Sequence, residues 1–519
     1  MTNNKLLIFL IVAVLCSATG TYSASFDLKV NLSDSLRPVT HCATGALYGI
    51  TETLPQDITG LVTPLKPCMY TQPARAGNGR QQPIGAAITV SERLKATTGT
   101  VTIRLADICP GWPYQWPGQS SWITEVTSVI NDKKTSGSDN YYGYEIWNEP
   151  NGTWTASNGN FNTACWKPTY DLIRQKDPGA KIIGPSDAYY VKSRLTDFLT
   201  FCKNNSCLPD IICWHELQGS ANISSHISDY RSIEKSLGIM PLAISINEYC
   251  HNTHDYEGCP GTSAPFIAKF ERNNVQSASI SWWFTDLPGR SGSLLTSSNS
   301  KGGGWWFYKW YADMTGFMTK VTPPNDASEG IDGFACLDTV NRYASICMGG
   351  NNAGTVNVII SGIPSSFGSS IDTKVECIEW KNKDTPVSGP TTIAEKAYDV
   401  SDGSLIVPVN VTSQFYGYRV YLSSKPAAVT ETTRRSSVTT NEITIHVDPA
   451  THLMSMTWPG NSSGSTDIVV FTPSGTVMQR VKAPGSNFKI GNLASGVYFI
   501  NIKRNHQSFI MIQSVMYSK

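Results

Sequence analysis

Two glutamates, Glu149 and Glu248, each end a short apolar segment and could work as a pair. Glu149 lies within Trp147-Asn148-Glu149-Pro150-Asn151, directly after the segment 141–146, and Glu248 follows the segment 241–247. Two carboxyl groups that flank one bond are the groups that cleave a glycosidic linkage, because one delivers a proton and the other attacks or activates water. The Asn148 amide beside Glu149 can bond a sugar hydroxyl. These segments predict a site for carbohydrate chemistry.

The two carboxyl groups need opposite protonation states for this reaction. The Trp147 ring and Pro150 are expected to desolvate Glu149 and raise its pKa, so that it starts as an acid. Glu248 is expected to stay ionised through hydrogen bonds and a nearby cation. Arg104, at the end of another apolar run, is the candidate cation, although it could instead pair with a core carboxylate such as Glu145.

Further polar and aromatic residues follow other apolar runs. His215 closes the run 211–215 and either contacts the first bound sugar or is a histidine of the barrel rim. Glu216 follows it and is a third carboxylate that could replace one of the two glutamates, but no Asn precedes it. Tyr249, directly after Glu248, is a second polar candidate for the first subsite. Trp112 stands in a proline-stiffened aromatic loop, 110–117, which predicts either a substrate wall or a cap on the domain.

The elements that must position these residues are strands that alternate with helices from residue 42 to 320. This alternation indicates a parallel sheet with crossover helices. Eight strand-helix units in about 280 residues fit a (β/α)8 TIM barrel, with Glu149 and Glu248 at the ends of strands four and seven on the carboxyl-terminal face. An open doubly wound sheet is the alternative, but no Gly-x-Gly-x-x-Gly follows an early strand. The predicted strands are 46–51, 68–71, 101–105, 142–147, 181–184, 211–215, 242–247 and 278–283.

The remaining sequence predicts β-structure. After Lys320 short alternating runs replace the helical pattern, which is typical of a β-sandwich. The run 493–502, Leu-Ala-Ser-Gly-Val-Tyr-Phe-Ile-Asn-Ile, resembles the carboxyl-terminal secretion-sorting domains of exported bacterial proteins, and a carbohydrate-binding module would have the same pattern. We therefore expect a signal peptide (1–24), an N-terminal strand segment that can join the sandwich (25–41), a catalytic barrel (42–320), a β-sandwich (321–425), a linker (426–442) and a C-terminal β-sandwich (443–519).

Composition restricts the class of partner. The formal net charge is +1 and 16% of residues are charged, which gives no electrostatic basis for binding nucleic acid or a polyanion. The 14 Trp and 22 Tyr residues include flat rings that can pack on sugar faces. We expect a neutral oligo- or polysaccharide partner, no nucleic acid and no cofactor.

The beginning of the chain predicts export. The apolar run 6–16 is shorter than the roughly 20 residues of a membrane span and precedes small polar residues, as in a secretory signal. The expected location is outside the cell or on its surface. Removal of Cys16 with the signal leaves an even number of cysteines, so disulfides are expected rather than a zinc site, with close spacings in the pairs Cys42/Cys68, Cys202/Cys207, Cys250/Cys259 and Cys336/Cys347.

The motif Glu145-Ile-Trp-Asn-Glu-Pro-Asn151, together with Ile246-Asn-Glu-Tyr249, resembles the glycoside hydrolases of clan A, family 39 most closely. The resemblance covers roughly residues 46–320. It implies a retaining mechanism with Glu149 as acid/base and Glu248 as nucleophile. It also implies that Asn148 bonds the hydroxyl beside the reacting carbon, that Arg104 lies near the nucleophile, and that Trp282 or Trp283 forms a platform under the first sugar.

The sequence thus predicts a secreted retaining O-glycosidase that acts on a neutral cell-wall or plant-type polysaccharide by double displacement. A catalytically silent carbohydrate-binding surface protein is one alternative, but such proteins usually lose one of the glutamates. A transglycosylase with the same residues is the other alternative.

Overall fold

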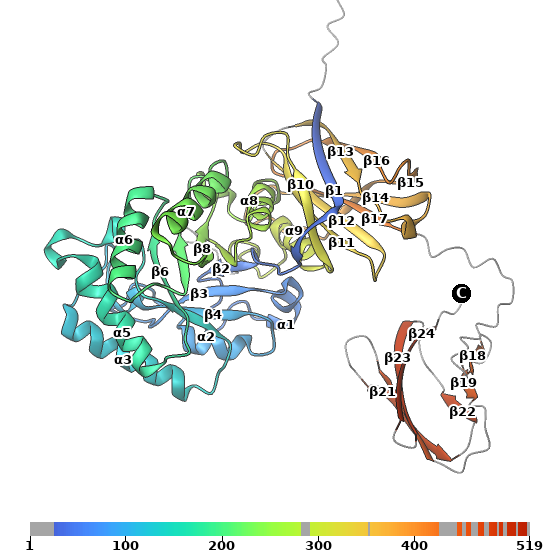
Figure 1. Ribbon diagram of the computed structural model, residues 1–519, viewed down its shortest axis with the longest axis horizontal. Coiled ribbons are helices and arrows are strands. Elements are labelled where there is room, and N and C mark those ends of the chain that lie inside the picture. The colour runs from blue at the N-terminus through green and yellow to red at the C-terminus, as the bar shows by residue number, and fades with distance from the viewer. Residues whose placement is uncertain are drawn as a thin grey trace, which may run out of the picture. The chain divides into compact units, whose positions relative to one another are not determined.

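The structure is a computed structural model that describes residues 25–281, 291–350 and 353–424 and seven strands beyond residue 443. The chain divides into two compact units, Met1–Lys425 and Pro426–Lys519. The predicted signal peptide and the predicted linker lie outside the described residues. Figure 1 shows the first unit as a barrel with an attached β-domain.

Eight parallel strands close into a barrel in chain order. This confirms the predicted (β/α)8 fold and excludes an open sheet. The strands are short and nearly all of their residues are buried, because the barrel interior covers one face and the helices cover the other. They are β2 (Gly45–Leu47), β3 (Met69–Pro73), β4 (Thr100–Arg104), β5 (Tyr141–Glu145), β6 (Ile182–Asp187), β7 (Ile211–Trp214), β8 (Ala243–Tyr249) and β9 (Ser277–Ile280).

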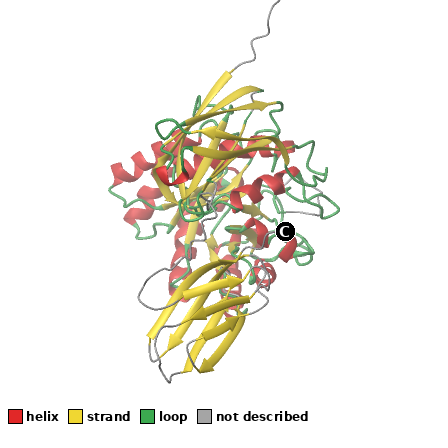
Figure 2. Ribbon diagram, turned by 90° about the vertical axis from the view of Figure 1, so that its right-hand side faces the viewer, coloured by secondary structure: helices red, strands yellow, loops and turns green. Residues whose placement is uncertain are grey.

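Helices surround the barrel (Figure 2). Helix α7 illustrates why they form: Ile223, Ile227, Tyr230 and Ile233 recur at helical spacing and are buried, and the helix ends where Gly238 adopts φ 60°. The segment between β2 and β3 forms only a single turn followed by a 3-10 turn, because Pro64 has no N–H to donate. The helices are α1 (Ile58–Leu61), α2 (Ala87–Leu94), α3 (Gln119–Thr135), α4 (Pro150–Thr153), α5 (Lys167–Lys176), α6 (Lys192–Asn204), α7 (Ile223–Leu237), α8 (Pro260–Arg272) and α9 (Gly303–Ala312).

A nine-stranded sheet follows the barrel, and the N-terminal segment lies inside it. Strand β1 (Ser25–Pro38) pairs antiparallel with β10 and parallel with β13, so Val30 stands between Val321 and Ile360. Alternate residues of these strands bury a separate apolar core. The other strands are β10 (Phe317–Thr322), β11 (Asp332–Asp338), β12 (Tyr343–Gly349), β13 (Gly354–Ser361), β14 (Ser370–Ile378), β15 (Thr391–Asp399), β16 (Leu405–Val411) and β17 (Gly417–Ser423).

Helix α8 joins the barrel to this sheet. Its residues from Pro260 to Glu271 are all buried, because α8 also packs against β11 and β12. Buried charges on α8 are paired: Lys269 lies 3.3 Å from Asp332, and Glu271 lies 2.7 Å from Arg37 of β1. The sheet is therefore fixed to the barrel by both packing and ion pairs.

The described residues of the second unit are all in strands. Two antiparallel sheets form, in the order β18-β19-β22 and β21-β20-β23-β24. The sorting or carbohydrate-binding role of this unit stays a prediction. Its strands are β18 (Thr444–Asp448), β19 (Leu453–Thr457), β20 (Ser465–Phe471), β21 (Val477–Pro484), β22 (Asn487–Ile490), β23 (Gly496–Arg504) and β24 (Gln507–Val515).

The described cysteines are all free thiols, so the structure forms none of the expected disulfides. The local geometry explains two of the cases. Cys336 is paired with Ser345 across β11 and β12, two positions from Cys347. Cys250 contacts His254, whereas Cys259 contacts the carbonyl of Phe415. None of the helices in the described part of the chain has the length and apolar character needed to cross a membrane.

Candidate active site

Glu149 occupies a strained turn at the carboxyl end of β5. Its φ of 52° is left-handed, which is unusual for a residue with a side chain. The turn is held by neighbours: the Glu149 N–H donates to the Ser186 carbonyl at 2.8 Å, and the Thr153 hydroxyl donates to the Asn148 carbonyl at 2.7 Å. Backbone strain that is held in place in this way is typical of functional sites.

Glu248 lies near the end of β8 and is ion-paired with Arg104. An Arg104 terminal nitrogen lies 2.7 Å from Glu248 Oε1, and Arg104 Nε donates to Glu145 at 3.0 Å. Arg104 therefore pairs with both carboxylates that the sequence suggested as its partner, Glu145 and Glu248. All three side chains are buried. The guanidinium holds the carboxylate of Glu248 at the barrel mouth.

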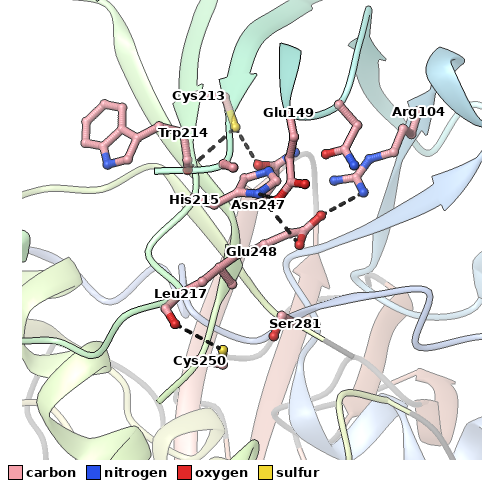
Figure 3. A network of polar contacts seen from close by, with 12 residues as sticks. Arg104, Glu149, Cys213, Trp214, His215, Leu217, Asn247, Glu248, Cys250 and Ser281 are labelled. Carbon is pink, nitrogen blue, oxygen red and sulfur yellow. Dashed lines mark hydrogen bonds and ion pairs between the residues drawn. The ribbon is translucent and has the colours of Figure 1, made fainter. Parts of the chain in front are cut away.

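His215 lies between the two glutamates (Figure 3). Its Nδ1 is 3.0 Å from Glu149 Oε1 and 3.7 Å from Glu248 Oε2. An oxygen of Glu149 lies within 4.8 Å of an oxygen of Glu248. Strands β5, β7 and β8 thus bring three ionisable groups to one point.

The pKa order of the two glutamates differs from the expected one. The hydrogen bond and charge of His215 lower the pKa of Glu149 although burial opposes this, and burial raises the pKa of Glu248 to about 7. The pKa of His215 is itself raised by the two carboxylates. The ring of Trp147, which was expected to desolvate Glu149, packs in an aromatic cluster with Tyr114, Trp116, Trp122 and Trp154.

Replacing His215 by glutamine should move the pH dependence of hydrolysis to higher pH. Loss of the imidazolium raises the pKa of Glu149, which must be protonated for the reaction, and the pKa of Glu248, which must be ionised. Both the acidic and the basic limb of the pH profile should therefore shift upward by about one pH unit. The measurement is the pH profile of kcat/KM. His226→Gln is the matched control, because His226 pairs with Glu216 at 2.8 Å outside the cavity. An unchanged profile in His215→Gln would contradict this role.

A cavity of about 470 Å³ opens above the two glutamates. The predicted residues Arg104, Asn148 and Trp112 line it, and Trp112 is 54% exposed at its edge. The sequence analysis did not identify several lining residues. One ends the first barrel strand, and the others lie in the loops after the first, second, sixth and seventh barrel strands, where attention to the loops would have found them. They are Leu47, Tyr48, Gln81, Gln82, Leu217 and His254.

Among the described residues, the predicted sugar contact Tyr249 does not line the cavity. Tyr249 points away from it, and its hydroxyl contacts the Ala43 carbonyl at 3.1 Å and the Tyr308 hydroxyl at 2.6 Å. This placement corrects the expected sugar contact, since Glu248 and Tyr249 alternate across β8. Trp282 and Trp283 lie outside the described residues. The competing carboxylate Glu216 is buried and accepts hydrogen bonds from Trp214 and His226.

Two groups bring three metal-type donor atoms within 4.8 Å of one another: Glu149/His215/Glu248 and Cys250/His254/Glu257. Each already faces a positive side chain. Arg104 is ion-paired with Glu248 in the first group, and Lys383 lies 3.1 Å from Glu257 in the second. A metal cation would be repelled there, so we interpret both groups as hydrogen-bonded networks.

Comparisons with known proteins agree with this fold. No protein-family model matches the chain. The chain is 31% identical over 341 residues to a 3-O-alpha-D-galactosyl-alpha-L-arabinofuranosidase of Bifidobacterium longum subsp. longum, covering 58% of this chain and 30% of that protein. It is 26% identical over 418 residues to a 3-O-beta-L-arabinopyranosyl-alpha-L-arabinofuranosidase of Bifidobacterium pseudocatenulatum, covering 67% and 42%. The chain thus spans less than half the length of these relatives.

Solved structures extend the comparison. N2152 from Neocallimastix frontalis is 53% identical, with a TM-score of 0.76, over 78% of this chain and all of that one. A family 39 glycoside hydrolase from Xanthomonas axonopodis pv. citri has a TM-score of 0.55 at 13% identity, over 79% of this chain and 100% of that chain. A monomeric beta-xylosidase from Caulobacter crescentus CB15 has a TM-score of 0.54 at 13% identity, over 76% and 99%.

The barrel with its attached sheet has the fold of the family 39 glycoside hydrolases in this comparison, and the two glutamates lie together at the barrel mouth, as the sequence resemblance led us to expect. Within that class the chain belongs to the same protein family as N2152.

Proposed function

We propose that the protein is a secreted retaining glycoside hydrolase that cleaves O-glycosidic bonds of a neutral plant-type glycan, with Glu149 as acid/base and Glu248 as nucleophile. The observation that carries the proposal is the distance between the glutamates. An oxygen of one glutamate lies within 4.8 Å of an oxygen of the other, which fits the carboxyl separation of about 5–5.5 Å in retaining enzymes better than the about 6.5–9.5 Å of inverting enzymes.

In the proposed first step Glu248 attacks the anomeric carbon, and Glu149 protonates the departing oxygen. The bond to the aglycone breaks and a covalent glycosyl-enzyme forms. Arg104 supports the ionised form of Glu248. His215 donates to Glu149 at 3.0 Å and has a raised pKa, so it can supply the proton that Glu149 delivers.

In the second step Glu149, now ionised, removes a proton from water, and the hydroxide attacks the same carbon from the vacated side. Glu248 departs as a carboxylate and the sugar keeps its original anomeric configuration. The ionised form of Glu149 is the form that the His215 hydrogen bond favours. The lowered pKa of Glu149 therefore suits this step, and the proton held by His215 suits the first.

We propose α-L-arabinofuranosides as the first substrates to test. Support comes from the two Bifidobacterium relatives, both of which bear the name of an α-L-arabinofuranosidase. The cavity lining fits a neutral sugar, since Gln81, Gln82 and Asn148 offer uncharged hydrogen-bonding groups.

The test is a panel of 4-nitrophenyl glycosides and arabinose-containing plant polysaccharides, with the released sugars identified by chromatography. We expect release of an arabinose-containing sugar and turnover of the α-L-arabinofuranoside above the β-D-xylopyranoside. Longer transfer products would instead indicate a transglycosylase. Binding without turnover of any member would indicate the silent carbohydrate-binding protein and would refute the proposed hydrolysis.

A further inference from the structure

A buried chain of hydrogen bonds runs beneath the cavity from Arg104 to Asn148, with Asp107 at its centre. Arg104 donates to the Tyr48 hydroxyl at 3.2 Å, and Tyr48 donates to Asp107 Oδ2 at 2.7 Å. On the other side Asn148 Nδ2 donates to the Tyr114 hydroxyl at 3.3 Å, and Tyr114 donates to Asp107 Oδ1 at 2.7 Å. The chain thus links the cation on the nucleophile to the neighbour of the acid/base.

The direction of every bond in this chain is fixed by chemistry. A guanidinium and an amide nitrogen can only donate, so each phenol oxygen accepts from one of them. Each phenol must then use its own proton on Asp107, which accepts both. Asp107 is the one member whose two oxygens are both acceptors, and this matches an ionised carboxylate.

Asp107 reaches the cavity only through the residues that it holds. It is fully buried and does not line the cavity, whereas Tyr48 and Asn148 do. A buried carboxylate is costly unless it is paired and hydrogen-bonded. The position is therefore explained by what Asp107 holds in place, namely the two phenols.

The bond to Tyr114 also sets the orientation of the Asn148 amide. Because Nδ2 is used, the other amide atom is Oδ1, and Oδ1 is buried without a partner among the described residues. A buried acceptor in a cavity wall requires a donor. A hydroxyl of the bound sugar is the donor that this cavity would supply.

We propose that Asp107 is a positioning residue for the proposed hydrolysis. Through Tyr48 it steadies Arg104 against Glu248, and through Tyr114 it turns Asn148 so that Oδ1 accepts from a sugar hydroxyl. The inference rests on the proposed function. It adds that a single buried carboxylate, in contact with neither glutamate, orders both halves of the site.

Two variants that each remove one oxygen atom test the two halves of the hydrogen-bond chain separately: the Tyr114 half, which reaches Asn148, and the Tyr48 half, which reaches Arg104. Tyr114→Phe frees the Asn148 amide to turn. We expect the ratio of kcat/KM between 4-nitrophenyl α-L-arabinofuranoside and its 2-deoxy analogue to fall about tenfold, the size of one hydrogen bond. Tyr48→Phe should leave that ratio unchanged, lower kcat/KM on both glycosides about equally, and move the acidic limb of the pH profile upward. Asp107→Asn keeps one acceptor oxygen for two phenols, so it should show at least one of the two effects.

Tyr144→Phe is the matched control. Tyr144 is buried and donates to Asp177 at 2.9 Å, but neither residue lines the cavity that holds the glutamates. Tyr144→Phe should change neither the ratio of kcat/KM between the two glycosides nor the acidic limb of the pH profile. Unfolding midpoints of all variants show whether each one is folded.

Outcomes for this proposal and for the proposed function are distinguishable. If the folded Asp107→Asn variant keeps the wild-type ratio and pH limb, the positioning role is overturned while hydrolysis stands. If the wild type hydrolyses no glycoside, the proposed function fails, and the Tyr48 half of the hydrogen-bond chain is read instead from the pKa of Glu248 by ¹³C NMR of the unliganded protein. A rise in the pKa of Glu248 in Tyr48→Phe supports the role, and an unchanged pKa overturns it.

Discussion

Replacing Glu248 by alanine should lower hydrolysis of 4-nitrophenyl α-L-arabinofuranoside by about 10⁴- to 10⁶-fold, because no glycosyl-enzyme can form without the nucleophile. Sodium azide should restore turnover. The small anion fits the space left by the carboxylate and attacks the anomeric carbon, which gives a glycosyl azide of inverted configuration. Rates with and without azide, together with NMR of the azide product, provide the measurement.

The matched control is Glu216→Gln. Glu216 also follows a barrel strand, but its carboxylate accepts from Trp214 and His226 and lies outside the cavity. We expect this variant to keep activity within a few-fold of wild type. Full activity in Glu248→Ala, or loss of activity only in Glu216→Gln, would refute the assignment of the nucleophile.

Replacing Glu149 by alanine should have an effect that depends on the leaving group. A poor leaving group needs its oxygen protonated, so hydrolysis of a natural glycan should fall about 10²- to 10⁴-fold. A 4-nitrophenolate departs without a proton, so formation of the glycosyl-enzyme from that substrate should change little. Its breakdown should become limiting, because no base remains to activate water.

The measurement for Glu149→Ala is kcat/KM over a series of aryl glycosides plotted against the pKa of the released phenol. The wild type should show a shallow slope and the variant a steep one. Equal slopes would exclude Glu149 as the proton donor. Because His215 pairs with Glu149 at 3.0 Å, the variant should also lose the basic limb of the pH profile.

The sequence was sufficient to predict the barrel and the placement of the glutamates at strand ends. Most barrel strands are short segments rich in apolar or small residues, and a parallel strand shows this pattern locally whatever its neighbours are. Residues that end such runs must gather at one face once the barrel closes. Arg104, Asn148, Glu149, His215 and Glu248 meet there for this reason.

Side-chain direction was harder to predict. Strand β8 continues through Tyr249, so alternation sends Glu248 into the barrel mouth and Tyr249 toward Phe266 and Phe270 of α8. Attention to alternation would have predicted this. The contribution of Gln81 and Gln82 could not be predicted in the same way, because they lie in a loop whose path depends on distant contacts, such as Arg80 on the Ile108 carbonyl at 2.7 Å.

The pKa order was also beyond local reasoning. The sequence places an aromatic ring two residues before Glu149, which favours a raised pKa for that residue. In the folded protein Trp147 turns into its own aromatic cluster, and His215, from a strand two positions further round the barrel, lowers the pKa instead. A three-group cluster is a property of the closed barrel, and no single segment of the sequence contains it.

The anomeric form of the sugar first released tests the central claim most directly. Time-resolved ¹H NMR of 4-nitrophenyl α-L-arabinofuranoside hydrolysis observes this form before mutarotation mixes the anomers. A pair of glutamates with oxygens within 4.8 Å predicts α-L-arabinofuranose as the first product, with the configuration of the substrate retained. Appearance of the β anomer first would contradict the double displacement through Glu248.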